Sequence, residues 1–328
     1  MTVTNKQVLI TGATGFLGRA LAKRLIDEGV RVRIIARTPE KAADLSALGA
    51  EIIKGDLTDA ESVRTACEGC EIVFHVAVNY TTYEAQQRVN VTGTQAIAQA
   101  AADAGVKRFV HVSTTATYGA KERGDLFEDH PLKPGAYPYA ITKVEGERVV
   151  REICNRAGMP YTIVRPGMIY GPGAQQWTNM IFNLAKQRFT IWLDGGQGWA
   201  HYIYVDDVVD LMVCAADHPK AIDEVFNVSA DPAPTWREVL DAYSKLAGKP
   251  LRLIPLRPVF WVVAAIAKLV SPPISMGRDL PDLLSFMGSK TTFKISKARD
   301  LLGWAPRVSL EDGVARCADS LREQGLLR

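Results

Sequence analysis

A glycine-rich stretch directly after an apolar run constrains the fold of this chain more than any other feature. The run Gln7-Val8-Leu9-Ile10 leads into Thr11–Gly18, and a helical pattern continues to Glu28. A strand, a tight turn and a helix in this order can hold the pyrophosphate of a dinucleotide, because the helix N-terminus offers unpaired N–H groups and partial positive charge. The predicted nucleotide contacts in this stretch are Gly12, Thr14, Gly15, Phe16, Leu17 and Gly18.

Each glycine of this G-x-x-G-x-x-G spacing has a separate expected role. Gly12 allows the sharp turn, Gly15 lets the backbone approach the phosphates, and Gly18 lets the helix pack closely on the strand. The spacing is one residue longer at the front than the long-established G-x-G-x-x-G pattern, so the prediction also depends on motifs farther along the chain.

Composition and charge bound the class of protein. The 328 residues suffice for one large domain or two modest ones, and 47% hydrophobic with 23% charged residues is ordinary for a folded globular chain. The net charge is +3, from 39 basic and 36 acidic residues without a dense basic run. This balance argues against a nucleic-acid-binding surface.

The cysteines and the longest apolar run predict a cytoplasmic protein without a membrane span. Five cysteines at irregular spacing indicate reduced thiols rather than a disulfide framework. Cys67 and Cys70 form a single C-x-x-C, which we interpret as packing and turn residues, so no metal site is expected. The run Val259–Ala267 is far shorter than the ~20 residues of a spanning helix, and no signal segment precedes the first strand.

Apolar runs alternate with helical patterns through the first half of the chain, which predicts an α/β fold of the Rossmann type with a doubly wound parallel sheet. Near-continuous apolar runs are typical of parallel strands that are buried on both faces. The predicted strands are 7–11, 31–36, 51–54, 71–76, 107–113, 160–165 and 224–228. The predicted helices are about 15–28, 39–48, 59–68, 83–104, 137–157 and 206–217.

Frequent Gly and Pro after Pro166 predict a second, smaller lobe. Because the strand at 224–228 returns to the sheet, this lobe is expected to be discontinuous. The predicted division is a nucleotide-binding domain of 1–165 plus about 206–230, a substrate lobe of about 166–205 and 231–292, and a helical tail of 293–328.

The end of the second strand predicts which dinucleotide binds. Arg37 follows this strand roughly 20 residues after the glycine turn, where an acidic residue would bond a ribose 2′-hydroxyl and an arginine can pair with a 2′-phosphate. This favours NADP(H), with NAD(H) as the alternative. Asp56 and Leu57, just past the third strand, are candidates for the adenine edge, although Gly55-Asp56 is also typical of a turn.

Tyr139 and Lys143 stand four residues apart in a helical pattern and therefore share one helix face. A phenol with a pKa near ~10 is a poor acid or base at neutral pH, and a neighbouring ammonium and a cationic nicotinamide would lower this pKa. The pair thus predicts acid/base chemistry. Tyr137 is a second candidate, but its partner four residues on is Ile141.

The strand Phe109–Val112 ends in three hydroxyl residues, Ser113, Thr114 and Thr115. Ligands bind outside the carboxyl ends of parallel strands, so these hydroxyls are expected to face the cofactor crevice. One of them could bond a substrate carbonyl and stabilise the charge that develops there.

With these motifs in order, the chain resembles the extended short-chain dehydrogenase/reductases over nearly its full length. The motifs that carry the resemblance are Thr11–Gly18, Gly55–Leu57, His75–Ala77, Asn90–Thr94, Ser113–Gly119, Tyr139–Lys143, Arg165–Gly167, Val205–Asp207 and Phe226–Val228. The resemblance implies Tyr139 as catalytic acid/base and Lys143 as binder of the nicotinamide ribose. It implies Thr114 as the catalytic hydroxyl, with Ser113 and Thr115 left as alternatives. It also implies that Ala77 and the stretch from Pro166 to Ile169 line the cofactor channel.

Within this family the chain resembles the branch of 3β-hydroxysteroid dehydrogenase-like and dihydroflavonol-reductase-like members. Nucleotide-sugar enzymes place arginines where this chain has Ala200 and the stretch Arg278–Asp282, which contains no R-x-G-D. The departures disfavour a nucleotide-sugar substrate. The apolar segment Val259–Ile266, with Trp192, Trp199 and Phe260, is expected either to line a hydrophobic pocket or to form the core of the lobe.

Three functions follow as hypotheses. The leading one is an NAD(P)(H)-dependent oxidoreductase that interconverts a secondary alcohol and a ketone on a small, largely apolar substrate. The second is a nucleotide-sugar epimerase or dehydratase that retains NAD, and the third is a non-catalytic NADP-sensing protein. The stretches Tyr83–Ala104 and Tyr137–Ala157 resemble those through which family members form homodimers, with a monomer as the alternative.

Overall fold

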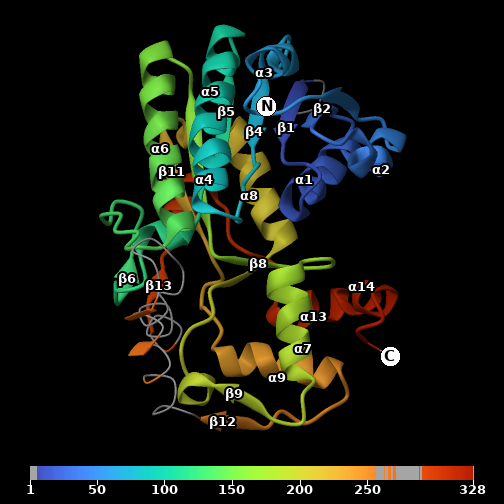
Figure 1. Ribbon diagram of the computed structural model, residues 1–328, viewed down its shortest axis with the longest axis vertical. Helices are drawn as coiled ribbons and strands as arrows, with labels where there is room; N and C mark the ends of the chain where they lie inside the picture. Colours follow the sequence, from blue (N-terminus) through green and yellow to red (C-terminus); the bar gives the residue numbers. More distant parts are fainter. Residues whose placement is uncertain are drawn as a thin grey trace.

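Seven strands, all parallel to their neighbours, form one sheet at the centre of the upper half of the molecule in Figure 1. Their order is β3-β2-β1-β4-β5-β7-β11, so the direction of winding reverses between β1 and β4. The strands are β1 (Gln7–Thr11), β2 (Arg31–Ala36), β3 (Glu51–Lys54), β4 (Ile72–His75), β5 (Arg108–Val112), β7 (Tyr161–Pro166) and β11 (Glu224–Val228). The predicted doubly wound fold is confirmed, with each strand within one residue of its expected ends.

The computed structural model describes residues 6–255, 262, 265–266, 269–270, 288 and 290–327. Within these ranges, no helix is both long enough and apolar enough to cross a membrane.

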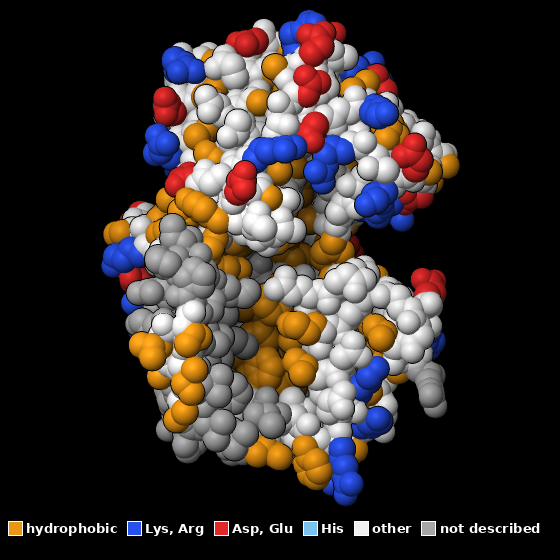
Figure 2. Space-filling view, viewed as in Figure 1, with side chains coloured by type: hydrophobic (Ala, Val, Ile, Leu, Met, Phe, Trp, Pro, Cys, Tyr) orange, Lys and Arg blue, Asp and Glu red, His pale blue; other side chains and the backbone are white. Residues whose placement is uncertain are grey.

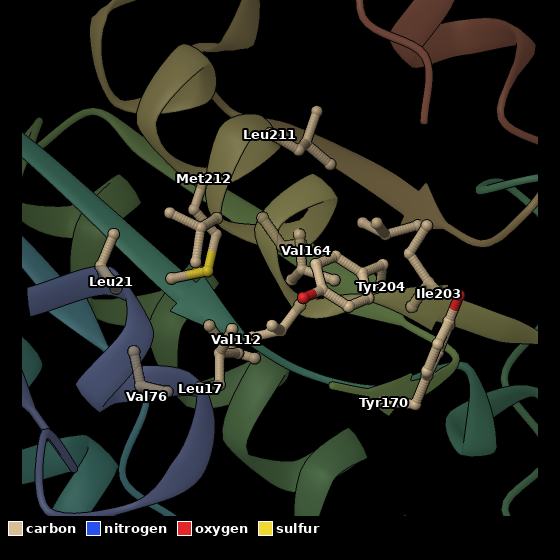
Figure 3. Packing of buried hydrophobic residues seen from close by; sticks show 14 of the residues in the cluster. Leu17, Leu21, Val76, Val112, Val164, Tyr170, Ile203, Tyr204, Leu211 and Met212 are labelled. Atoms are coloured by element: carbon tan, nitrogen blue, oxygen red, sulfur yellow. The ribbon is translucent and has the colours of Figure 1, made fainter. Parts of the chain in front are cut away.

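Helices cover both faces of the sheet because successive strand residues point to opposite sides. Val8 and Ile10 pack with Leu21 of α1 (Phe16–Asp27) and Leu211 of α8 (Val205–Asp217). Figure 3 shows Leu17, Leu21, Leu211 and Met212 of these helices around Val112 and Val164 of the sheet. Leu9 points to the other face, which α3 (Ala60–Cys67), α5 (Thr94–Asp103) and α6 (Pro138–Ala157) cover.

Short elements connect these layers. They comprise η1 (Pro39–Ala42), α2 (Ala43–Ala47), α4 (Tyr83–Gln86), η2 (Gln87–Gly93), η3 (Thr115–Tyr118), β6 (Asp125–Leu126), β8 (Met168–Tyr170), β10 (Tyr202–Tyr204), η6 (Pro219–Ala221), β13 (Thr292–Phe293) and α12 (Ser296–Leu302). The helix expected over 83–104 is therefore three consecutive pieces, of which η2 is a π-helix.

Most of the lower half of the molecule in Figure 1 is built from segments that follow Pro166. It holds η4 (Gln175–Met180), α7 (Ile181–Ala185), β9 (Thr190–Trp192), η5 (Leu193–Gly196), α9 (Trp236–Leu246), β12 (Leu253–Pro255), α13 (Leu310–Arg316) and α14 (Ala318–Glu323). Trp236 is fully buried here, with ring centroids 4.9 Å from Trp192 and 5.8 Å from Tyr202. Trp192 is thus part of this lobe's core.

The apolar segment near residue 260 is described only in part. Val262 and Ile266 are helical and 60% and 57% exposed, so these two side chains are not core residues. Val259, Phe260 and the stretch Arg278–Asp282 lie outside the described residues.

Candidate active site

The carboxyl ends of the parallel strands bring the predicted site residues to one edge of the sheet. Gly12 follows β1, Ala77 follows β4 and Thr114 follows β5, while Pro166 is the last residue of β7. Because β1 and β4 are the strands between which the winding reverses, this edge holds the crevice where doubly wound folds bind ligands.

The geometry of the glycine turn fits a pyrophosphate. Gly12 has φ +76°, and a Cβ there would lie 2.7 Å from the backbone of Ala77. A Cβ on Gly18 would lie 2.4 Å from the carbonyl oxygen of Gly12, so this position needs glycine as well. The helix α1 begins after Gly15 with no side-chain cap and no acidic residue in its first turn, which leaves its first N–H groups available for an anion.

The other residues of this turn differ in how far their side chains are exposed to a ligand. Thr14 is exposed and Phe16 half-buried at the turn, whereas the Leu17 side chain is buried in the core. Leu17 therefore offers a ligand only its backbone. Farther along the crevice, Ala77 and Ile169 are half-buried and Pro166 is buried at the end of β7.

Two arginines surround Asp56 at the expected adenosine end. Arg37 is exposed after β2, and Arg88 Nη2 lies 3.8 Å from Asp56 Oδ2. Burial acts to raise the pKa of Asp56, but hydrogen bonds from Thr58 and the charges of Arg37 and Arg88 lower it overall. Asp56 Oδ1 accepts from both the backbone N–H and the hydroxyl of Thr58 at 2.9 Å, which is turn chemistry. The buried Leu57 packs against Gly93.

Lys143 is fixed beneath the crevice on the second turn of α6. Its side chain is 2% exposed, and Nζ donates to the carbonyl oxygen of Val112, the last residue of β5, at 2.6 Å. Burial lowers the pKa of Lys143 to about 8, although the Glu147 carboxylate one turn on acts in the opposite direction. The i, i+4 spacing does place Lys143 on the same helix face as Tyr139.

Two other hydroxyl groups contact the phenol of Tyr139. It is hydrogen-bonded to the side chains of Thr114 and Tyr80. Burial, with Tyr80 and Tyr137 close by, raises the pKa of Tyr139 well above its ordinary value. The expected lowering of this pKa is therefore not found in the protein by itself, in which burial has the largest effect and only the hydrogen bond with Thr114 acts to lower it.

Among the three hydroxyls after β5, Thr114 is the one that bonds Tyr139. Its Oγ1 also accepts from Ala116 N–H at 3.2 Å and thereby caps η3. Ser113, Thr114 and Thr115 are 2%, 8% and 7% exposed, so the bond to Tyr139, and not exposure, distinguishes Thr114.

Tyr80 is a site residue that the sequence reasoning missed. It lies in the loop between β4 and α4, is 61% exposed, and has its ring centroid 4.8 Å from that of Tyr139. The available signal in the sequence was that Tyr80 follows a strand of the crevice by five residues. A tyrosine in a loop is common, so this position alone gave no reason to name it as a site residue.

A buried network behind Lys143 was also missed. Arg165 donates to both carboxylate oxygens of Glu147, at 2.8 and 2.7 Å, and to the Tyr118 hydroxyl at 2.8 Å. Tyr118 in turn donates to Asn227 Oδ1 at 2.7 Å. These bonds tie α6 to β7 and β11, so they hold the helix that carries Tyr139 and Lys143.

The surface below the sheet edge is apolar where it is hollowed. Figure 2 shows a hollow in the lower half whose visible floor consists of hydrophobic side chains. Ala200, the predicted counterpart of an arginine in nucleotide-sugar enzymes, is fully buried and adds no charge.

Comparison with known proteins agrees with this geometry. The sequence model of the NAD dependent epimerase/dehydratase family matches residues 8–229. The chain belongs to this family. It is an enzyme of the extended short-chain dehydrogenase/reductase type, as expected from the order of its motifs.

Members of the family that resemble this chain act on different substrates. The chain is 29% identical to a 4-hydroxy-2-methyl-3-oxo-4-farnesyl-3,4-dihydroquinoline-1-oxide ketoreductase of Stigmatella aurantiaca, covering 97% of this chain and 96% of the relative. It is 30% identical to a UDP-glucose 4-epimerase of Mycolicibacterium smegmatis, covering 97% and 99%. The solved structure of MoeE5 in complex with UDP-glucose and NAD is 25% identical with a TM-score of 0.76, covering 97% and 99%.

Proposed function

We propose that this protein interconverts a secondary alcohol and a ketone on a small, largely apolar substrate, with Tyr139 as the acid/base. The observation that carries the proposal is the Tyr139 hydroxyl, which bonds Thr114 while Lys143 is fixed one turn farther along the same helix. The apolar hollow below the sheet edge and the farnesylated substrate named for one relative support an apolar substrate.

Each site residue has a distinct task in the proposed reaction. A bound nicotinamide supplies or accepts the hydride. Thr114 donates a hydrogen bond to the substrate oxygen, and the Tyr139 hydroxyl gives its proton to that oxygen as charge develops there. Because the pKa of Tyr139 is raised, the phenol carries its proton at neutral pH, which suits ketone reduction. Lys143 would bind the nicotinamide ribose and favour the phenolate that forms.

Replacement of the phenol tests the catalytic assignment. Tyr139→Phe should lower kcat for reduction of apolar ketones by about 10²- to 10⁴-fold, the usual contribution of a positioned proton donor, and should leave NADPH affinity unchanged. Tyr137→Phe is the matched variant, because Tyr137 is the neighbouring candidate, and it should retain turnover. Full activity of Tyr139→Phe would rule out this mechanism.

We further propose that NADP(H) is preferred to NAD(H). The support is the pair of arginines near Asp56, which would face a ribose 2′-phosphate. Fluorescence titration should show NADPH binding about tenfold tighter than NADH, as expected from one charge-assisted hydrogen bond. Arg37→Asp should abolish the preference, whereas Arg322→Asp, with the same charge change far along the chain, should keep it. Tighter NADH binding by the unaltered protein would overturn the proposal.

A nucleotide-sugar epimerase or dehydratase is the second candidate, favoured by the UDP-glucose 4-epimerase relative. Such an enzyme regenerates its own cofactor, so it would purify with NAD bound and show no net oxidation or reduction. Absorbance of the released cofactor and an assay with UDP-glucose separate the two candidates. A non-catalytic sensor is less consistent with the chain, because it would have no need of the Tyr139 and Lys143 pair.

A further inference from the structure

The lower end of the molecule exposes hydrophobic side chains far from the candidate active site. Leu184 of α7 is 37% exposed, Phe189 is 48% exposed and Ile254 of β12 is 39% exposed. Hydrogen bonds bring their segments together. Thr190 Oγ1 donates to the Leu184 carbonyl at 2.8 Å, and Thr190 N–H donates to the Arg252 carbonyl at 2.9 Å. The three exposed side chains therefore form one patch, the apolar tip.

Basic side chains surround this apolar tip. The guanidinium carbons of Arg188 and Arg252 lie 5.4 and 5.9 Å from the centre of the Phe189 ring. Lys249 is exposed, and its Nζ donates to the Lys186 carbonyl oxygen at 3.1 Å. In the part of the chain that the structure describes, no ion pair involves Arg188, Lys249 or Arg252, in contrast to the arginines of α1 and α3, which pair with carboxylates. The tip therefore combines exposed apolar surface with positive charge that no carboxylate partner offsets.

The sequence around the apolar tip has the same character. Neither the stretch 174–193, which contains α7 and β9, nor the stretch 242–278, which contains β12, has an acidic residue. Four described residues of the second stretch are helical and 57% to 87% exposed, namely Val262, Ile266, Leu269 and Val270. Their spacing places them on one helix face. Figure 2 shows hydrophobic and basic side chains together at the lower end of the molecule, where Figure 1 places β9 and β12.

We propose that the apolar tip and the cations around it bind the surface of a lipid bilayer that contains anionic headgroups. The apolar side chains enter the boundary between headgroups and acyl chains, while Arg188, Lys249 and Arg252 contact lipid phosphates. A second copy of this chain suits the tip less well, because a two-fold contact would bring the same cations against each other. Such binding does not depend on the proposed reaction.

Co-sedimentation with lipid vesicles tests this surface. The unaltered protein should bind vesicles of phosphatidylcholine and phosphatidylglycerol at least about tenfold more tightly than vesicles of phosphatidylcholine alone. Added salt should weaken this binding, because it screens exposed charges. Arg188→Gln combined with Arg252→Gln should weaken binding by about fivefold for each charge removed. Phe189→Ser should weaken it by about tenfold, as expected for an aromatic side chain that leaves water on binding.

Matched changes outside the apolar tip are the controls. Leu48→Ser alters an apolar residue that is likewise 48% exposed, and Lys107→Gln combined with Lys220→Gln removes two exposed cations. Both controls should bind the acidic vesicles as the unaltered protein does, and every variant should keep its unfolding temperature.

Three results would overturn the proposal. The first is equal binding to both kinds of vesicle, and the second is an equal loss of binding in the controls. The third is no binding to acidic vesicles. If sedimentation equilibrium then showed that Phe189→Ser separates a dimer, the apolar tip would be an interface between copies of this chain instead.

Discussion

At the scale of single residues, Lys143 is an ammonium held in the protein interior at a cost to stability. In the folded protein its pKa is about 8, against 10.5 ordinarily, so between these values the unfolded chain binds more protons. Stability attributable to Lys143 therefore rises with pH across this window. From pH 8 to pH 10.5, the free energy of unfolding of the unaltered protein should increase by ~3 kcal/mol relative to that of Lys143→Met.

The comparison between the two proteins isolates this effect. Buried Cys67 and Cys154, whose pKa values burial raises to about 12, also titrate in this region, but they are present in both proteins and cancel. Urea unfolding at a series of pH values supplies the measurement. A difference that stays constant across this window would show that Lys143 is not buried as an ammonium.

The sequence predicted site residues where local spacing or strand ends relate them. The four-residue spacing of a helix relates Tyr139 to Lys143. Thr114 was found because it follows the end of a strand. Tyr80 and Arg88 are linked to their partners only by the folded chain, since 59 residues separate Tyr80 from Tyr139. No periodic pattern spans such a separation, so these contacts became apparent only in three dimensions.

At the scale of elements, residues of the helix α6 form ion pairs in opposite environments. Glu147 and Arg165 are both 2% exposed and lie 2.7 Å apart, while Arg148 and Glu152 are 70% and 59% exposed and lie 3.6 Å apart. Arg165→Met leaves the buried Glu147 carboxylate with only the partly exposed Arg151, 3.3 Å away, as an ion-pair partner, so it should destabilise the protein by about 3 kcal/mol. Arg148→Met, the matched control on the same helix, should cost less than about 1 kcal/mol.

Chemical denaturation of both variants measures this difference. The double change Arg165→Met with Glu147→Gln should recover part of the loss, because the buried carboxylate is then removed. Burial would raise the pKa of Glu147, but Arg165 holds it below its ordinary value. A loss for Arg165→Met no larger than that for Arg148→Met would mean that this network does not hold α6 to β7.

Element boundaries followed from the sequence where apolar runs and breakers were sharp, as in β1, β2 and β11. The helix pattern over 83–104 gave no sign of the π-helix Gln87–Gly93, because its apolar residues continue through it. The wider turn of this π-helix accompanies the hydrogen bonds of Asn90 with Asn79 and with Thr142 of α6. Packing across segments, rather than propensity within one, sets this detail.

At the scale of the whole molecule, the association of two copies is the remaining prediction. The helices α5 and α6 pack against each other and lie side by side in Figure 1. Arg156 donates to Gln99 at 2.9 Å between them, and Ala96, Ala100 and Val144 are half-buried on these helices. Small and partly exposed side chains permit close approach of a second helix pair, which favours a homodimer through this face.

Sedimentation equilibrium should therefore give twice the 35.9 kDa of one chain. Ala96→Arg places a long cation on the face and should shift the protein to the mass of one chain without lowering its thermal stability as a monomer. Leu48→Arg, at an exposed apolar residue after α2, is the control and should remain dimeric. A single species at the mass of one chain for the unaltered protein would contradict the prediction. Tyr139 and Lys143 lie on α6, one of the two helices of this face. The kcat of monomeric Ala96→Arg, compared with that of the unaltered protein, would therefore show whether dimerisation affects the position of these residues.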